Sequence, residues 1–434
     1  MFAGTPLSRE AGSKAMSVCE ISRPTQKCVT PFNLEAGFSE EAFRGLLLAV
    51  HVLDFSDVSI ISGRPIWGKR HGFNQKLTTR VLQDAEVRTT ISWMYGANGV
   101  TEIMKGHALD PRYEVQITHS VADWCNKILQ EFGLGGLVEK TSNQSRKIPF
   151  RMNAVGAYTP KGRGFSVSLR TIPMELPLLE HMGLPNDLAP HINQSNGMTL
   201  VCGETGSGKS TLLAAIMHDK MLNFQDRKIA TIEKPIEFNL QGVASDSNYV
   251  VQHEVGPDVS SFYQGVVNCL RQAPTDIMVG EARDMESISA LIQATETGHA
   301  TYATIHSYSV DGCILRIANE FDLANQSQII FKILSQVRLI VVQRLIKSKS
   351  GGRRVPVREW LVFDDRLRRK LMGLSSDTAL ELIRQTIVKN GHSMRQQALS
   401  AYKDGLIGVI DLKAITGDLT AEERAELNLE EDIS

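Results

Sequence analysis

The sequence has few cysteines, no long apolar run and almost no net charge. Its six cysteines among 434 residues are scattered without a C-x-x-C pair, which argues against a disulfide framework or a four-cysteine zinc site and predicts reduced thiols. Apolar runs such as 339–342 are too short to span a bilayer, and residues 1–28 lack the apolar core of a secretory signal. A net charge of −1 provides no global basic field for nucleic acid, although a local basic patch is compatible with it.

The most informative stretch that is present fits the phosphate-loop pattern G-x-x-x-x-G-K-[ST]. An apolar run, 197–202, precedes it and predicts a strand, and 211–217 predicts a helix. Glycines let backbone N–H groups converge on a polyphosphate, and the helix adds the positive end of its dipole. The pattern predicts a nucleotide site rather than a glycine turn without a ligand. Its residues are Gly203, Glu204, Thr205, Gly206, Ser207, Gly208, Lys209, Ser210 and Thr211.

Two strand-like runs that end in acids are candidates for the rest of a hydrolytic site. Hydrolysis requires one carboxylate to orient water and another to support Mg²⁺. Glu233 ends the run 229–233, and Glu281 follows the run 277–280. A single glutamate at the end of a strand is more often a surface residue. Beside a phosphate loop, however, both are expected at the carboxyl edge of a parallel sheet, where such folds bind ligands.

Two histidines bracket a third apolar run. His299 and His306 are seven residues apart, so on a strand their side chains face opposite sides. Each is compatible with a structural role, and the two need not act together. We expect at least one of them to sense the γ-phosphate, because a protonatable donor suits an anion site.

The pattern of predicted elements divides the chain into five pieces. Residues without periodicity come first, and a stretch with Pro173 and Pro177 separates two globular parts. In the second part strands and helices alternate, which predicts an α/β fold with a mostly parallel sheet. The pieces are a disordered tail (1–30), an α+β N-terminal domain (31–170), a linker (171–185), a nucleotide domain (186–370) and a helical C-terminal region with an acidic tail (371–434).

Local patterns also predict individual elements of the N-terminal domain. Helical periodicity covers 40–53, 86–95 and 120–132. Strand patterns cover 57–61, 66–70, 147–154 and 164–172, with a turn over 158–163. The acidic segment 418–432 is compatible with a frayed, solvated helix or with a partner-docking tail.

Four motifs occur in the order typical of the secretion-ATPase superfamily, which includes PilT-type pilus retraction motors, type II and IV secretion motors and conjugation ATPases. The motifs are the Walker A loop (203–211), an acidic box (232–237), a Walker B segment (270–284) and a histidine box (297–306). The sequence is identified as a member of this superfamily over about residues 35–415. The segments 56–67, 167–173 and 279–284 resemble DotB-type ATPases of Dot/Icm systems and the TraJ proteins of I-type conjugative plasmids. The zinc-binding cysteines of many type II secretion and pilus-extension motors are missing.

The resemblance implies a RecA-like P-loop NTPase domain with a smaller PAS-like N-terminal domain, assembled as a homohexamer that uses ATP and Mg²⁺. It implies that Lys209 holds the phosphates, that Ser210 holds Mg²⁺, that Glu281 supports Mg²⁺ or the water, and that Glu233 positions the water. Arg151 and Arg170 lie on the N-terminal sheet, where the family places arginine fingers; surface ion pairs are the alternative role for both.

The chain also departs from the family. Lys234 stands where an Asp is usual in the acidic box, and Ala273 and Thr275 replace usual acids near Walker B. The C-terminal Ala-Ile-Arg-Asn-Leu-Ile-Arg motif of retraction motors is not recognisable. These differences put the Mg²⁺ or structural role of the missing Asp, and true pilus retraction, in doubt.

The leading hypothesis is a cytoplasmic ATPase motor that docks peripherally on an inner-membrane secretion or conjugation complex. A pilus retraction motor is the first alternative, and it predicts altered pili with intact substrate transfer. A nucleic-acid-stimulated RecA-like ATPase is the second. The neutral charge and the lack of a basic aromatic groove argue against direct nucleic-acid binding.

Overall fold

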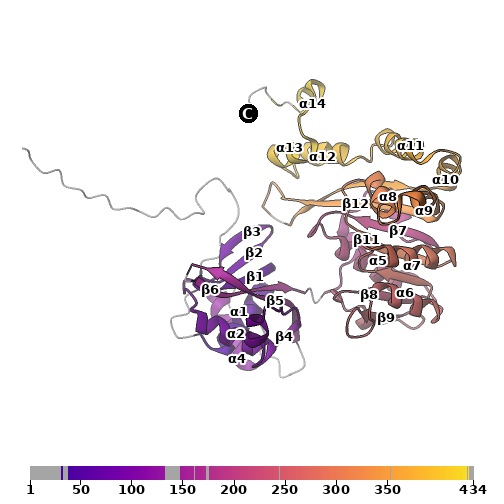
Figure 1. Cartoon of the computed structure of the whole chain (residues 1–434). Coiled ribbons are helices and arrows are strands. Elements are labelled where there is room, and N and C mark those ends of the chain that lie inside the picture. The colour runs from indigo at the N-terminus through magenta and orange to yellow at the C-terminus, as the bar shows by residue number, and fades with distance from the viewer. Residues whose placement is uncertain are drawn as a thin grey trace, which may run out of the picture.

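A computed structural model describes residues 31–32, 38–131, 147–160, 162–172, 175–243, 245–351, 353–427 and 429. The predicted disordered tail and the last residues of the acidic tail lie outside the described residues. The described chain contains two separate sheets, one in the N-terminal part and one in the C-terminal part (Figure 1). Within the described ranges, no helix is both long and apolar enough to cross a bilayer.

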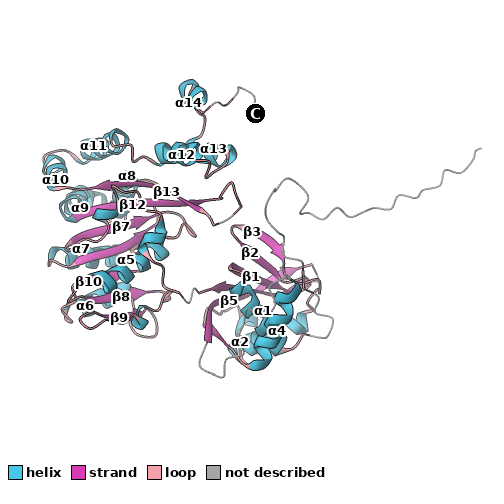
Figure 2. Cartoon of the chain, turned by 180° about the vertical axis from the view of Figure 1, so that it is seen from behind, coloured by secondary structure: helices cyan, strands magenta, loops and turns pink. Residues whose placement is uncertain are grey.

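The N-terminal sheet is antiparallel and is covered by helices on one face (Figure 2). Alternate residues such as Val167 and Leu169 are buried beneath these helices, because side chains alternate across a strand. Its strands in spatial order are β3 (Phe73–Lys76), β2 (Trp67–Arg70), β1 (Phe55–Ile61), β6 (Gly162–Thr171), β5 (Lys147–Thr159) and β4 (Arg112–Gln116). The helices of this part are α1 (Glu40–Val52), α2 (Asp84–Tyr95), α3 (Gly99–Met104) and α4 (His119–Glu131).

A row of charged residues crosses this sheet from strand to strand. In the register of the sheet, each residue of the row lies directly opposite the next one. The row consists of Arg112, Arg151, Arg170, Asp57 and Lys69. These positions alternate with the buried positions, so the row lies on the face that α1, α2 and α4 leave uncovered.

The C-terminal sheet is parallel except for its last pair, β12–β13, which is antiparallel. The carboxyl ends of β7, β8, β10, β11 and β12 therefore lie at one edge, which we call the carboxyl edge. The strands in spatial order are β13 (Val355–Val362), β12 (Val337–Ile346), β7 (Gly197–Cys202), β11 (Ala300–Ile305), β10 (Asp276–Val279), β8 (Lys228–Glu233) and β9 (Tyr249–Glu254).

Helices cover both faces of the C-terminal sheet. One apolar cluster packs α5 and the 3₁₀ turn η1 against one face, and a second packs the remaining helices against the other. Helix α5 spans Lys209–Asn223 and η1 spans Leu179–Met182. The second cluster includes α6 (Phe262–Leu270), α7 (Met285–Glu296), α8 (Val310–Ala318), α9 (Leu323–Gln336), α10 (Asp365–Leu371), α11 (Ser376–Lys389), α12 (Met394–Lys403) and α13 (Val409–Thr416).

The C-terminal helices share their core with the sheet. Apolar residues from Met198 through Leu419 belong to one buried cluster. Glu359 on β13 strengthens this connection, because its carboxylate accepts hydrogen bonds from the N–H groups of Val310 (2.8 Å) and Met394 (3.2 Å). These two residues begin α8 and α12, so one buried side chain binds the amino ends of both helices.

The predicted fold class is confirmed, with a mostly parallel α/β sheet, a smaller α+β part and a helical C-terminal region. The predicted turn over 158–163 is much tighter than expected. Strands β5 and β6 continue to Thr159 and from Gly162, and Gly162 adopts a left-handed φ of 101°. Strands β3 and β4 are short and polar, so the sequence pattern did not predict them.

The loop between β12 and β13 approaches the N-terminal sheet (Figure 1). The Nζ atom of Lys347 lies 4.4 Å from the centroid of the Phe73 ring on β3. This loop follows the carboxyl end of β12, so the carboxyl edge is the side of the C-terminal sheet that faces the N-terminal part.

Candidate nucleotide site

The phosphate loop connects a fully buried strand, β7, to the amino end of α5. Gly206 and Gly208 have φ values of 79° and 83°, a conformation that favours glycine. A Cβ atom on Gly203 would lie 2.3 Å from the Gln343 carbonyl oxygen, whereas one on Gly206 would meet nothing within 4 Å. Gly203 therefore allows the loop to pack closely against β12, and Gly206 leaves the inside of the loop open.

Lys209 lies inside this loop and is 8% exposed. Its Nζ donates to the carbonyl oxygens of Gly203 (3.0 Å) and Glu204 (2.9 Å). Burial lowers the pKa of this ammonium group, although nearby carboxylates, including those of Glu281 and Glu237, act in the opposite direction.

Two further features of the loop fit a polyphosphate. Among the described residues Lys209 has no carboxylate within ion-pair distance, and the buried hydroxyl of Ser207 has no hydrogen-bond partner. A buried cation held only by carbonyl groups, beside a hydroxyl that lacks a partner, suits an anionic ligand. Ser210 follows Lys209 in the first turn of α5, and its hydroxyl is of the kind that holds Mg²⁺ in phosphate loops.

Glu233 ends β8 at the carboxyl edge and is 7% exposed. One of its carboxylate oxygens, Oε1, accepts hydrogen bonds from Thr231 Oγ1 (2.7 Å) and Gln252 Nε2 (3.1 Å). Burial raises the pKa of Glu233 to about 7, even though these hydrogen bonds favour the ionised form. A fixed carboxylate with a pKa near neutrality is suited to accept a proton from water. Lys234, the departure from the usual acidic box, is exposed.

Glu281 and His306 meet at the same edge. Glu281 follows β10 and His306 follows β11, two neighbouring parallel strands. The Nε2 atom of His306 lies 3.5 Å from Oε1 of Glu281, and both side chains remain partly accessible. The structure thus joins the ends of two motifs that are separate in the sequence.

The structure does not bring His299 to this edge. It precedes β11, so it lies at the amino edge of the sheet, opposite the phosphate loop. Its Nδ1 atom lies 3.0 Å from the Ala294 carbonyl oxygen and 3.0 Å from Thr297 Oγ1, at the carboxyl end of α7. Within one chain these contacts suit a helix cap.

Arg151 and Arg170 lie opposite each other in the N-terminal sheet. Arg151 pairs with Asp110 at 3.1 Å, and Arg170 pairs with Asp57 at 3.1 Å. Both guanidinium groups are well exposed, so either of them is accessible to a neighbouring molecule.

Sequence reasoning missed three polar residues that contact the site. Gln252 lies on β9 beside Glu233, Gln343 on β12 donates to the Ser207 carbonyl (2.6 Å), and Arg354 donates to the Gly206 carbonyl (3.0 Å). All three come from strands or loops distant in the sequence. Local sequence patterns carry no signal for them, because their contacts depend on the strand order β12–β7 and β8–β9 and on the loop that precedes β13.

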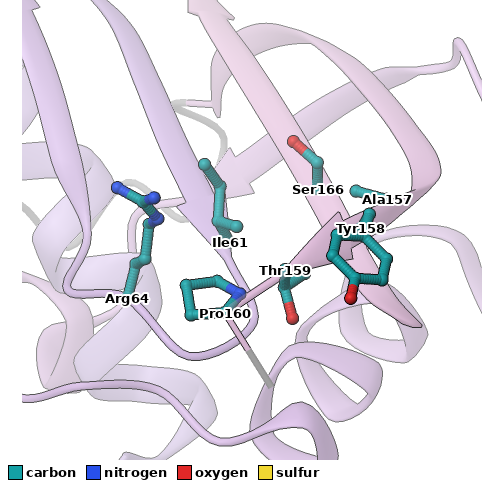
Figure 3. Close-up of a pocket in the computed structure, with 7 residues that line it drawn as sticks. All are labelled: Ile61, Arg64, Ala157, Tyr158, Thr159, Pro160 and Ser166. Atoms are coloured by element: carbon teal, nitrogen blue, oxygen red, sulfur yellow. The ribbon is translucent and has the colours of Figure 1, made fainter. Parts of the chain in front are cut away.

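A separate hollow of about 430 Å³ lies in the N-terminal part, beside the turn between β5 and β6 (Figure 3). Ile61, Arg64, Tyr158 and Pro160 are among the residues that line it. It contains none of the acids or loop residues described above, so it is not the nucleotide site.

Comparisons with known proteins match the part of the chain that contains this site. A family model described as type II/IV secretion system protein matches residues 140–412. The type IV pilus retraction ATPase PilT of Pseudomonas aeruginosa is 31% identical over 278 residues, which cover 64% of this chain and 76% of that protein.

Two crystal structures extend the likeness to the N-terminal part. The ATPase DotB of Legionella pneumophila superposes with a TM-score of 0.77 at 30% identity, over 89% of this chain and 98% of DotB. The pilus retraction motor PilT with bound ADP gives a TM-score of 0.65 at 25% identity, over 86% and 97% of the two chains. The chain therefore belongs to the type II/IV secretion system protein family, among the secretion and pilus-motor ATPases, and has a DotB-like architecture.

Proposed function

We propose that this protein hydrolyses ATP to power a type IV secretion or conjugative transfer system. One observation carries the proposal: Lys209 in its loop, the buried Glu233 and the Glu281–His306 pair all lie at the carboxyl edge. This edge faces the N-terminal sheet, whose exposed arginines supply the positive charge that phosphoryl transfer needs.

ATP binds with its phosphates in the loop 203–211. Lys209 exchanges its bonds with the carbonyls of Gly203 and Glu204 for bonds with phosphate oxygens, which its buried charge favours. Ser210 and Glu281 would hold Mg²⁺, which would neutralise charge at the phosphates. The hydroxyl of Ser207 gains a partner among the same phosphate oxygens.

Glu233 orients the attacking water and accepts its proton. Thr231 and Gln252 hold one carboxylate oxygen, so the side chain cannot rotate away from this position. The pKa of about 7 leaves a substantial ionised fraction at neutral pH, and the protonated form is also stable in this environment.

His306 senses the γ-phosphate through its contact with Glu281. Arg151 and Arg170 act from the N-terminal sheet as finger residues in a homohexamer, where each meets the nucleotide at an interface between domains. Each arginine exchanges its present aspartate, Asp110 or Asp57, for the charge that develops on the phosphoryl group. Loss of the γ-phosphate then releases the two domains, and this release is the motor stroke.

The motor works in the cytoplasm and docks peripherally on an inner-membrane secretion or conjugation complex. The likeness to DotB over 98% of that chain supports this reading. The relation to PilT supports a second candidate, a pilus retraction motor. Deleting the gene separates them, because a retraction motor changes pilus number or length and leaves substrate transfer intact.

The first test is ATP turnover by the purified wild-type chain, together with molar mass by light scattering of the Glu233→Gln variant with and without Mg-ATP. The variant should bind ATP, fail to hydrolyse it and form a hexamer. Turnover at the wild-type rate would refute the role of Glu233. A monomer under every condition would refute the interface mechanism.

A further inference from the structure

Arg358 on β13 is a buried cation without a carboxylate partner. It is 4% exposed, and burial lowers its pKa to about 10. Among the ion pairs of the described residues, none includes Arg358. Its partners are neutral oxygens, namely the Gln343 side chain (2.8 Å), the Gly183 carbonyl (2.7 Å) and the Met182 carbonyl (2.6 Å). Burying a charged guanidinium group costs free energy, and these hydrogen bonds offset that cost.

Gln343 continues the connection toward the phosphate loop. It lies directly opposite Arg358 in the β12–β13 ladder and is 3% exposed. Its Oε1 accepts from Arg358, so its Nε2 must point the other way, and there it donates to the Ser207 carbonyl at 2.6 Å. A flipped amide would set its NH₂ group against the guanidinium, so the neighbours fix its orientation.

The Ser207 carbonyl and the Gly208 N–H belong to the same planar peptide unit. The hydrogen bond from Gln343 therefore sets the direction in which the Gly208 N–H points. In a phosphate loop such N–H groups hold the nucleotide. Any rotation of this peptide toward or away from a phosphate must change the bond with Gln343.

The other end of the connection is the segment that follows the N-terminal sheet. Turn η1 ends at Met182 and is capped by Gly183, which is in the left-handed region with φ 56° and ψ 48°, and Arg358 binds the carbonyls of both residues. Nearby, His218 Nδ1 on α5 lies 3.0 Å from the Pro177 carbonyl. Residues 175–183 are thus attached both to α5 and, through Arg358, to the phosphate loop.

We propose that Arg358 and Gln343 are positioning residues that couple the phosphate loop to residues 175–183, and through them to the N-terminal domain. The proposal rests on the ATPase function proposed above. Nucleotide in the loop fixes the 207–208 peptide, Gln343 follows it, and Arg358 transmits the change to the carbonyls of Met182 and Gly183. The hydrogen bonds of Gln343 with Ser207 and with Arg358 are buried, so water does not compete with them, whereas the bonds of Arg358 with Met182 and Gly183 are partly buried.

The test is hydrogen exchange on the full chain with and without Mg-AMP-PNP, in the wild type and in Gln343→Glu. This variant keeps an acceptor for Arg358 and gives it a counter-charge, but it loses the donor to Ser207. We expect AMP-PNP to change exchange in wild-type residues 176–184 and at the start of α5. In Gln343→Glu the response at α5 should remain and the response in 176–184 should be lost, with nucleotide affinity about fivefold weaker.

Two more variants make the test specific. Arg358→Lys provides a single donor nitrogen in place of the three guanidinium nitrogens that bond Gln343, Gly183 and Met182, so it cannot reach all three acceptors and should lose the same response. The thermal midpoint of this variant checks that it is folded. Arg338→Met, on the same strand as Gln343 but bonded to Asp365 and Asn196, should respond like the wild type. A full nucleotide response of 176–184 in folded Gln343→Glu or Arg358→Lys would overturn the relay.

The same data separate the two proposals. A wild type that hydrolyses ATP and responds at α5, but shows no response in 176–184, would refute the relay and leave the ATPase function standing. A wild type that neither binds AMP-PNP nor hydrolyses ATP would refute both.

Discussion

The hydrogen bond from Thr231 to Glu233 opposes the rise in pKa that burial causes, so removing it should shift the pH dependence of turnover. Thr231 is fully buried on β8, and its hydroxyl donates to Glu233 Oε1 at 2.7 Å. The variant Thr231→Val keeps the shape and the strand preference and removes this donor. A hydrogen bond to a charged group contributes about 1.5–3 kcal/mol and one to a neutral group about 0.5–1.5, so the ionised carboxylate loses about 1–1.5 kcal/mol more than the acid. The pKa of Glu233 should therefore rise by about one unit, from about 7 to about 8.

The assay is kcat against pH from 6 to 9 at saturating Mg-ATP. At pH 7 the ionised fraction of Glu233 should fall from about a half to about a tenth, so turnover should drop about fivefold. At pH 9 the variant and the wild type should differ little. Thr199→Val is the matched control, because Thr199 is also buried on a strand and its hydroxyl has no partner among the described residues. A loss of activity that is equal at every pH, or no shift at all, would refute the role of Glu233 as the proton acceptor.

Four further variants test other parts of the structure. Lys209→Ala should abolish turnover in a coupled ATPase assay by removing the charge in the loop. Glu233→Gln should raise the thermal midpoint at pH 8 and not at pH 4, because the raised pKa of Glu233 means that the wild type loses stability as pH rises from about 4.5 to about 7. Arg151→Ala should lower kcat and leave binding of a fluorescent ATP analogue unchanged; weaker binding with normal kcat would argue against a finger role. Lys220→Met should cost about 3 kcal/mol in urea unfolding, because it removes the ion pair of the buried Asp276 at 2.6 Å and leaves that carboxylate with Arg227 at 3.7 Å; a much smaller loss would show that the Lys220 ion pair is dispensable.

Local sequence patterns predicted the elements that carry the phosphate loop and the acids. Strand β7, the glycines and the start of α5 follow one another directly, so neighbouring residues determine this unit. Glu233 and Glu281 are each fixed to the edge by the strand that precedes them, and parallel pairing brings the strand ends together. The assignments of catalytic roles stay predictions until they are tested with the variants above.

The partners of these residues depend on strand order, which local patterns do not contain. Gln252 reaches Glu233 because β9 pairs with β8, and Gln343 reaches Ser207 because β12 pairs with β7. For His299, the direction of the strand that follows it could have refined the prediction that at least one of the two histidines senses the γ-phosphate. A residue that precedes a strand of a parallel sheet lies at the edge opposite a loop that follows one.

The two backbone hydrogen bonds of the Glu359 carboxylate indicate what a C-terminal truncation would do to the protein. Shortening the chain after residue 370 would remove the N–H group of Met394 and leave this buried carboxylate with Val310 as its remaining backbone donor. Burial already raises the pKa of Glu359, so the loss of a donor would disfavour its ionised form further. The terminal helices are thus an integral part of the C-terminal α/β core rather than an appendage, and Glu359 links the start of α12 to the start of α8, the helix that follows His306.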